Sequence, residues 1–149
     1  MARPTRVDPR GQRFAAAITA VVLALVLVTP PAVSVTLLVA QTAVFAIGAL
    51  VSLAASPYAL AYARLVRPRI GPPAELEDAR PPRFAQGVGL GFATVALIGF
   101  VAGAPVVGLT AVGLALVAAL LNASVGLCLG CEMYLAWQRF RPAPLNTPT

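Results

Sequence analysis

The chain has 149 residues, of which 59% are apolar and 11% charged, and its formal net charge is +6. Soluble globular domains carry about 45–50% apolar and about 25% charged residues, so this composition argues against a soluble enzyme and indicates an integral membrane protein. The sequence contains no histidine, which excludes a Ser-His-Asp triad and an imidazole metal ligand.

Two long segments without any charged residue, 14–63 and 84–131, each predict a pair of membrane-spanning helices. One crossing needs about 20 apolar residues, so each segment holds two crossings if it contains a turn. The clusters Thr-Pro-Pro at 29–31 and Gly-Ala-Pro at 103–105 supply these turns, because proline interrupts a continuing helix.

The predicted helices cover residues 9–29, 32–62, 82–103 and 105–139, with a polar loop over 63–81. Asp8 followed by Pro9 is typical of a helix start, with an N-cap and a proline at the first helical position. We therefore expect an all-α, polytopic fold: one integral membrane domain over 1–149, with four transmembrane helices arranged as two hairpins.

All eleven basic residues are arginines, and they lie before the first helix, around the loop 63–81 and after the last helix. Neither hairpin turn carries a charge. Cytoplasmic loops are enriched in Lys and Arg, so we expect both termini and the central loop to be cytoplasmic. This placement explains the basic character through orientation and contact with the lipid bilayer, and we predict no binding to nucleic acid.

The two predicted hairpins share sequence patterns. Arg-x-x-Arg-Phe-Ala occurs at 10–15 and again at 80–85, and Leu-Ala followed by an aromatic residue precedes an arginine at 60–64 and 135–139. Because both hairpins begin and end on the same side, they are expected to be parallel repeats related by an axis along the membrane normal. A pathway between the halves and a bundle that merely packs well both fit this pattern, and we favour the second interpretation.

Glycine pairs predict close helix packing. Gly99 with Gly103, and Gly126 with Gly130, form G-x-x-x-G patterns that let helix backbones approach each other. The glycines over 87–91 lack the spacing of a nucleotide-binding loop and lie inside a span, so they predict no nucleotide site. We expect no cofactor.

The two cysteines, Cys128 and Cys131, form a C-x-x-C pair near the cytoplasmic end of the last predicted helix. Residues three apart share one face of a helix, so both thiols should point the same way. We identify the pair as candidate catalytic residues, because cysteines in a reducing compartment are used for redox catalysis or sensing more than for permanent disulfides. Two alternatives stay open: small buried apolar residues, or half of a Cys₄ site shared by two copies. The pair alone predicts no metal site.

The whole chain resembles a bacterial multi-pass membrane family, the domain of unknown function four-three-nine-five. The resemblance rests on Val-Asp-Pro-Arg at 7–10, Pro-Arg-Phe-Ala-Gln at 82–86, and residues 122–134. It implies a protein of the bacterial inner membrane encoded near thioredoxin-like proteins and thiosulfate sulfurtransferases. Such a protein is therefore the expected cytoplasmic partner of Cys128 and Cys131.

Three functions are compatible with these observations. The first is thiol–disulfide redox chemistry or sulfur relay by the C-x-x-C pair at the cytoplasmic face. The second is a small permease subunit for a sulfur compound, which is weakened because Gln41, Gln86 and Asn122 are almost the only intramembrane polar residues. The third is a structural or assembly subunit without chemistry.

Overall fold

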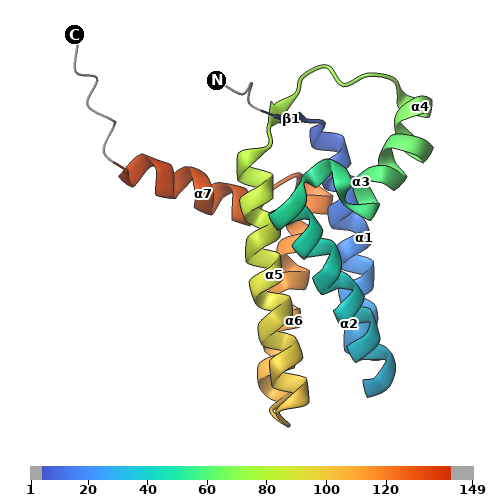
Figure 1. Cartoon of the computed structure of the whole chain (residues 1–149), viewed down its shortest axis with the longest axis vertical. Coiled ribbons are helices and arrows are strands. Elements are labelled where there is room, and N and C mark those ends of the chain that lie inside the picture. The colour runs from blue at the N-terminus through green and yellow to red at the C-terminus, as the bar shows by residue number, and fades with distance from the viewer. Residues whose placement is uncertain (1–4, 142–149) are drawn as a thin grey trace.

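Four long helices dominate the computed structural model, which describes residues 5–141 (Figure 1). In chain order they are α1 (Pro9–Val28), α2 (Pro31–Ala46), α5 (Arg80–Val101) and α6 (Pro105–Val125). With α2 continued to Val51 by a π-helical turn, each is long and apolar enough to cross a membrane. The predicted all-α polytopic fold is confirmed.

The start of α1 has the predicted cap. The Asp8 carboxylate accepts a hydrogen bond from the backbone N–H of Arg10 at 2.9 Å, and Pro9 occupies the first helical turn. At the other end of the hairpin, the Ser34 hydroxyl donates to the carbonyl of Val26 at 2.8 Å. This bond ties α2 to α1 where the chain reverses.

The predicted helix over 32–62 is wrong after Val51, and the predicted loop over 63–81 is wrong as far as Ile70, where the chain is still helical. After Val51 the chain turns extended at Ser52 (φ −164°, ψ 156°). Short helical segments come next: a 3₁₀ turn over Leu53–Ala55, α3 (Pro57–Ala61), a π-helical turn over Tyr62–Val66 and α4 (Arg67–Ile70). Proline cannot continue a preceding helix, so Pro57 starts a new one.

The predicted helix over 105–139 is also wrong, because it is two helices. α6 ends at Val125, and Gly126 adopts a left-handed conformation (φ 75°, ψ 12°) that only glycine reaches readily. The second helix, α7 (Leu129–Phe140), projects sideways from the bundle (Figure 1).

Two short strands join the chain segments that precede α1 and α5. β1 (Arg6–Val7) pairs antiparallel with β2 (Glu77–Asp78), and the Ala79 N–H donates to the Thr5 carbonyl at 2.9 Å. These contacts hold the entrance of the second hairpin beside that of the first.

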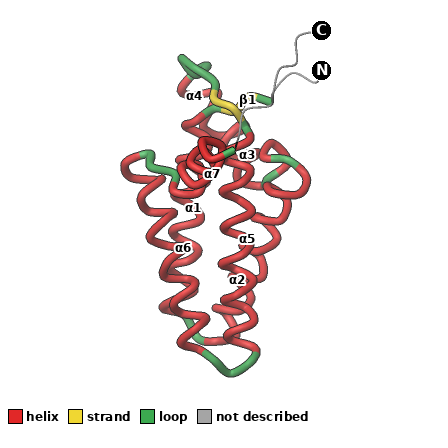
Figure 2. Tube along the Cα trace, turned by 90° about the vertical axis from the view of Figure 1, so that its left-hand side faces the viewer, coloured by secondary structure: helices red, strands yellow, loops and turns green. Residues whose placement is uncertain are grey.

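The two hairpins interlock. α1 packs on α6 and α5 packs on α2, while α5 and α6 also contact each other (Figure 2). The buried apolar cluster draws on all four long helices and comprises Leu23, Val26, Leu38, Phe45, Ala93, Ala96, Ala111 and Val112. Most of this core lies in the half of the bundle nearer the hairpin turns.

Close helix approach uses other glycine partners than the predicted pairs. A Cβ on Gly99 would lie 2.7 Å from the backbone nitrogen of Gly108, so α5 and α6 touch through their backbones there. Gly103 lies in the turn with φ 73° and has no packing partner within 4 Å of such a Cβ. Gly126 likewise caps a helix instead of packing within one.

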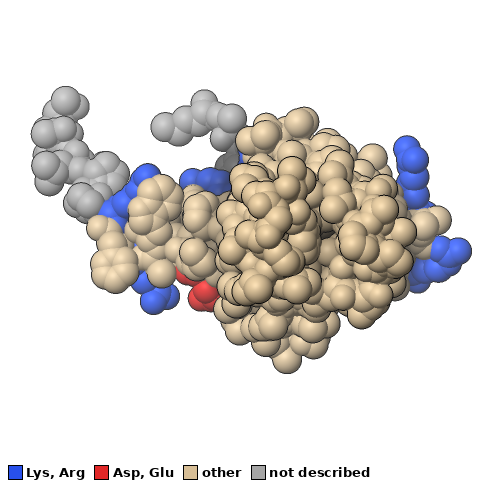
Figure 3. Space-filling view, turned by 90° about the horizontal axis from the view of Figure 1, so that it is seen from below, with Lys and Arg blue, Asp and Glu red and all other residues tan. Residues whose placement is uncertain are grey.

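Charge is confined to one end of the bundle. Seen from the hairpin-turn end, the surface is uncharged across the bundle, and arginines appear only at its margins (Figure 3). From this asymmetry we predict that the charged end of the bundle faces the cytoplasm.

Candidate functional site

Cys128 and Cys131 are joined by a disulfide at the first turn of α7, with their Cα atoms 5.2 Å apart. Cys128 is the N-cap residue, with extended backbone angles (φ −87°, ψ 97°). The prediction of a pair inside a continuous helix is wrong, since Gly126 ends α6 before the first cysteine. The pair bridges the first turn of a new helix, where no helix interior has to be distorted.

The backbone of this turn favours negative charge on Cys128. Its Sγ accepts a hydrogen bond from the Cys131 N–H, with an N–S distance of 3.3 Å. The first N–H groups of a helix lack intrahelical acceptors and carry the positive end of the helix dipole. A thiolate on Cys128 after reduction would therefore be stabilised, as at other helix starts. Glu132 opposes this effect from an exposed position.

The first turn of α7 is fixed against α5. A Cβ on Gly130 would lie 2.6 Å from the Cβ of Ala85, so the two helices are in direct contact. The Phe84 ring lies 5.6 Å from Tyr134 and 6.3 Å from Trp137, centroid to centroid. These contacts hold the disulfide over the arginine end of the bundle, with both cysteines half-buried.

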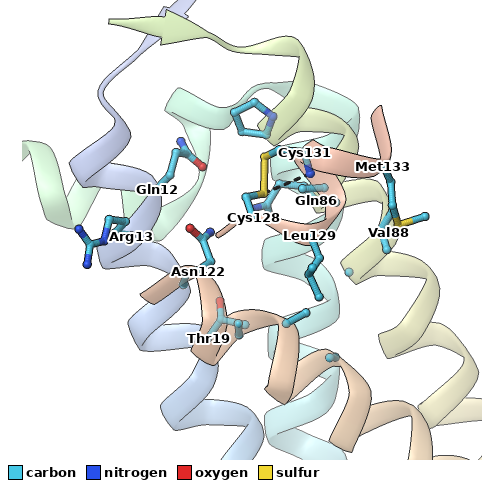
Figure 4. Close-up of a pocket in the computed structure, with 18 of the residues that line it drawn as sticks. Gln12, Arg13, Thr19, Gln86, Val88, Asn122, Cys128, Leu129, Cys131 and Met133 are labelled. Atoms are coloured by element: carbon cyan, nitrogen blue, oxygen red, sulfur yellow. Dashed lines mark hydrogen bonds between the residues drawn. A yellow bond between two sulfur atoms is a disulfide. The ribbon is translucent and has the colours of Figure 1, made fainter. Parts of the chain in front are cut away.

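A cavity of about 360 Å³ lies under this turn, lined by residues of α1, α2, α5, α6 and the start of α7 (Figure 4). Both cysteines line it, together with Gly126 and Gly130. The disulfide is thus part of the cavity wall and also borders the surface at the end of the bundle.

The cavity wall changes character with depth. Its polar side chains gather near the disulfide: Gln12, Gln86 and Asn122, with Thr19 about two turns farther along α1 than Gln12. The deeper wall is apolar, with Phe45, Phe92, Leu114, Ala115 and Ala118. In Figure 4 the disulfide stands above Asn122, and Thr19 lies lower in the view.

Three side-chain amides line the cavity near the disulfide. Within residues 5–141, Gln12, Gln86 and Asn122 make no side-chain hydrogen bond to another protein group. The Gln86 side chain, including its amide oxygen, is packed against Gly48: a Cβ there would lie 2.9 Å from its Cγ and 3.0 Å from its Oε1. An amide can donate to a carbonyl or accept from a hydroxyl.

Arg13 lies at the cavity rim with its charge already engaged. Its Nη2 donates to the carbonyls of Ala123 at 3.2 Å and Ser124 at 2.9 Å, in the last turn of α6. Cations at a helix C-terminus satisfy free carbonyls and the negative end of the dipole. Glu77, the acidic residue of the rim, has the opposite charge.

Gln41 is not part of the cavity wall but belongs to a buried network that reaches the wall at Thr19. Its side chain is 1% exposed, accepts a hydrogen bond from Tyr58 at 2.7 Å and donates to Thr19 at 3.4 Å. Burial raises the pKa of Tyr58. Gln41 is therefore a satisfied core residue.

A second network closes the arginine end of the first hairpin. The Tyr62 hydroxyl donates to Asp8 at 2.8 Å, and the Arg10 guanidinium pairs with the same carboxylate at 3.1 Å. Partial burial raises the pKa of Asp8, but the hydrogen bonds from Arg10 and Tyr62 outweigh it and leave that pKa below its ordinary value.

Sequence reasoning missed the cavity, because its polar residues come from three helices far apart in the chain. In the sequence, Gln86 and Asn122 stand out only as isolated polar residues. The break before the cysteines did have a signal: Gly126 comes directly after an apolar run, as a C-terminal helix cap does. Within the described residues, no group of three or more His, Cys, Asp or Glu could hold a metal ion.

Comparison with known proteins gives one family. A family model described as Domain of unknown function (DUF4395) matches residues 7–139. No curated protein and no solved structure matches the chain.

Proposed function

The chain belongs to the DUF4395 family, and from its site we propose that it carries out thiol–disulfide exchange in a membrane through Cys128 and Cys131. The observation that carries the proposal is the position of Cys128 at the start of α7, bonded to Cys131 and accepting the Cys131 N–H. This position lets the pair exist as a disulfide and stabilises the thiolate that reactivity requires.

The exchange follows from this geometry. A Cys128 thiolate attacks one sulfur of a partner disulfide, forms a mixed disulfide and releases the partner's second sulfur as a thiolate. Cys131 then attacks the mixed disulfide at Cys128, which closes the internal bond and frees the partner as a dithiol. Two electrons pass to the partner, and the reverse sequence reduces the pair.

A disulfide is favoured over a stable persulfide at this site. If Cys128 received a sulfane sulfur, Cys131 lies within bonding reach, at a Cα separation of 5.2 Å. Its thiol would attack Cys128 and release the sulfur as hydrogen sulfide, leaving the disulfide. Sulfur relay would therefore end in the same oxidised pair.

The proposed location is the cytoplasmic face of a bacterial inner membrane, with both termini cytoplasmic. The arginines support it, because they lie at the end of the bundle that carries the disulfide. α7 supports it as well, since one side carries the exposed apolar residues Met133, Trp137 and Phe140, as interfacial helices do. A thioredoxin-like protein or a sulfurtransferase is the proposed aqueous partner.

Trapping of the exchange intermediate tests the proposal. The purified full chain with Cys131→Ser is mixed with an oxidised thioredoxin-like protein, and mixed disulfides are detected by non-reducing electrophoresis. We expect Cys131→Ser to accumulate an adduct through Cys128. The matched variant Cys128→Ser should accumulate far less, because Cys131 lacks the stabilised N-cap position.

Thiol labelling of the wild-type chain is a second test, and it can contradict the proposal. In glutathione buffers of increasing oxidising strength, maleimide labelling of both thiols should disappear together. Two thiols that stay labelled independently in oxidising buffer would leave only a packing role for the pair.

A further inference from the structure

The cavity under the disulfide continues into a groove on the outer face of the bundle. The groove runs between α5 and α6 and shares Val88, Phe92 and Leu114 with the cavity wall. Its remaining lining is almost wholly apolar: Gly91, Val95, Val106, Val107, Thr110 and Ala111. This face belongs to the membrane-spanning part of both helices, so the groove borders the cavity on the side that would face lipid.

The shape of the bundle explains why the groove is open at this level. Toward the hairpin turn, α5 and α6 touch through Gly99 and Gly108. Farther up, a Cβ on Gly91, which lines the groove, would meet no atom within 4 Å. The glycines that bring the two helices together near the turn thus give way to a glycine that leaves space in the groove.

The cavity suits an uncharged head group. Phosphate-bearing redox carriers are bound by free cations or by helix N-termini aimed at the phosphates. The α7 N-terminus at this cavity is capped by Cys128, whose Sγ accepts the Cys131 N–H. Among the described residues lining the cavity, Arg13 is the one cation, and its Nη2 is bonded to two carbonyls. Glu77 at the rim would repel an anion. The unpartnered amides of Gln86 and Asn122 are suited to a neutral carbonyl instead.

We propose that this cavity binds a prenylated quinone, which accepts the two electrons of the reduced Cys128–Cys131 pair. The proposal rests on the thiol–disulfide function above and names its electron acceptor. The quinone ring lies among the amides under the disulfide, and the prenyl tail runs along the groove between α5 and α6 into lipid. A ring with a long apolar tail matches a polar cavity that opens into an apolar groove.

The reaction balances without another reactant. Two S–H bonds break and one S–S bond forms between Cys128 and Cys131. The quinone takes up the two electrons and two protons, and an O–H bond forms at each of its two oxygens. The hydroquinone leaves along the groove, and an aqueous dithiol protein reduces the pair again.

The test uses the full chain in lipid nanodiscs without oxygen, reduced beforehand and freed of reductant. A fully ring-substituted benzoquinone with a decyl tail is the probe, because thiols cannot add to its ring. Ultraviolet absorbance monitors quinone reduction, and maleimide labelling monitors the thiols. We expect one hydroquinone for each disulfide formed, and none from the Cys128→Ser, Cys131→Ser double variant.

Two glycines one turn apart on α5 supply a matched pair of variants for the groove. Gly91 lines the groove and Gly87 does not, and a Cβ on either meets no atom within 4 Å. Gly91→Leu should raise the half-saturating concentration of the decyl quinone about tenfold. It should leave the same quinone without a tail unaffected, and Gly87→Leu should change neither value.

Blocking the cavity separates the two proposals. Ala118→Phe should abolish reduction of both quinones while the thiols still cycle in glutathione buffer, and Val117→Phe on the lipid-facing side should retain both activities. Cycling in buffer without quinone reduction by the wild type overturns the quinone proposal alone. Equal quinone reduction by wild type, Ala118→Phe and Gly91→Leu overturns the cavity as its site. A pair that does not cycle at all removes the proposed function, and the acceptor with it.

Discussion

The first hairpin, residues 8–62, and the second, residues 78–134, use the same contacts at the arginine end of the bundle. Asp8 and Asp78 each accept the backbone N–H two residues ahead at 2.9 Å. Phe14 and Tyr62 meet at 5.7 Å with a 48° interplanar angle, and the second hairpin repeats this with a 5.6 Å contact at 47°. The Arg-x-x-Arg-Phe-Ala repeat is therefore also a repeat of local structure. The structural counterpart of Tyr62 is Tyr134, and not Trp137, with which the Leu-Ala-aromatic pattern aligned it.

Each hairpin also caps the other. Arg13 of the first hairpin bonds the last carbonyls of α6, and Arg83 of the second bonds the carbonyls of Ala49 and Leu50 at the end of the α2 segment, at 2.7 and 3.2 Å. The two arginines occupy the same position of the repeated Arg-x-x-Arg-Phe-Ala pattern. Capping across the repeat explains why both arginines lie at the start of a span.

The two hairpins differ at the start of the short helix that precedes or contains the aromatic partner, which is Tyr62 in the first hairpin and Tyr134 in the second. When Tyr62 and Tyr134 are aligned, Ser56 at the start of α3 corresponds to Cys128 at the start of α7. Ser56 is buried, and Tyr58 closes its side of the bundle with a bond to Gln41. In the second hairpin, Gly130 takes the position of Tyr58, and the cavity lies beneath Gly130. Both halves thus share one framework, and the proposed thiol chemistry depends on the one helix start at which they differ.

Moving the cysteine pair to the first hairpin should have the largest effect on the proposed activity. In a chain with Cys128→Ser and Cys131→Ser, the changes Ser56→Cys and Ala59→Cys reproduce the spacing at an extended N-cap residue. We expect this pair to form a disulfide and the reduction of the decyl quinone to be lost completely, because the cavity wall includes neither position. Mass spectrometry of the disulfide and the absorbance assay check both results. Quinone reduction at the wild-type rate would show that the cavity is not needed.

A bulkier residue at Gly130 should separate α7 from α5. A Cβ there meets Ala85 at 2.6 Å, whereas a Cβ on Gly113 meets nothing within 4 Å. We expect Gly130→Leu to cost about 1–3 kcal/mol in the free energy of unfolding and to slow thiol exchange. Gly113→Leu should be neutral or slightly stabilising, because leucine favours a helix over glycine. Detergent thermal denaturation measures both, and equal midpoints would remove the contact as the anchor of the disulfide.

The two repeated aspartates should differ in their contribution to stability. The Asp8 side chain is 13% exposed and Asp78 is 41% exposed, and hydrogen bonds hold the pKa of both below the ordinary value of 3.8. A lowered folded pKa means that the stabilisation is present above the unfolded value and is lost as pH falls through the folded value.

We therefore expect Asp8→Asn to lower the free energy of unfolding at neutral pH by about 1 kcal/mol, since the charge-assisted bonds from Arg10 and Tyr62 weaken. Asp78→Asn should cost less, because solvent screens its pair with Arg80. The difference from wild type should shrink as pH falls below 3.8 and vanish below the lowered folded pKa, where the carboxylate of the wild type is protonated. Thermal unfolding at several pH values checks this, and a difference that persists in acid would contradict the charge-based explanation.

Part of this protein is determined by sequence alone. The uncharged segments, their proline-marked turns and the cap at Asp8 predicted four spans in two hairpins, because hydropathy and capping are properties of short segments. The repeat was visible for the same reason, and it predicted that the hairpins run parallel. The C-x-x-C spacing identified the two cysteines that the structure joins.

Tertiary structure decided how these parts meet. The end of α6 depends on one dihedral angle at Gly126, which apolar periodicity does not reveal. The capping of α6 by Arg13 joins residues more than a hundred positions apart. The cavity exists because α5 and α6 touch at Gly99 and Gly108 and leave space nearer the disulfide. Local sequence sets which segments are helical, but the space between helices depends on side chains from different segments that only packing brings together.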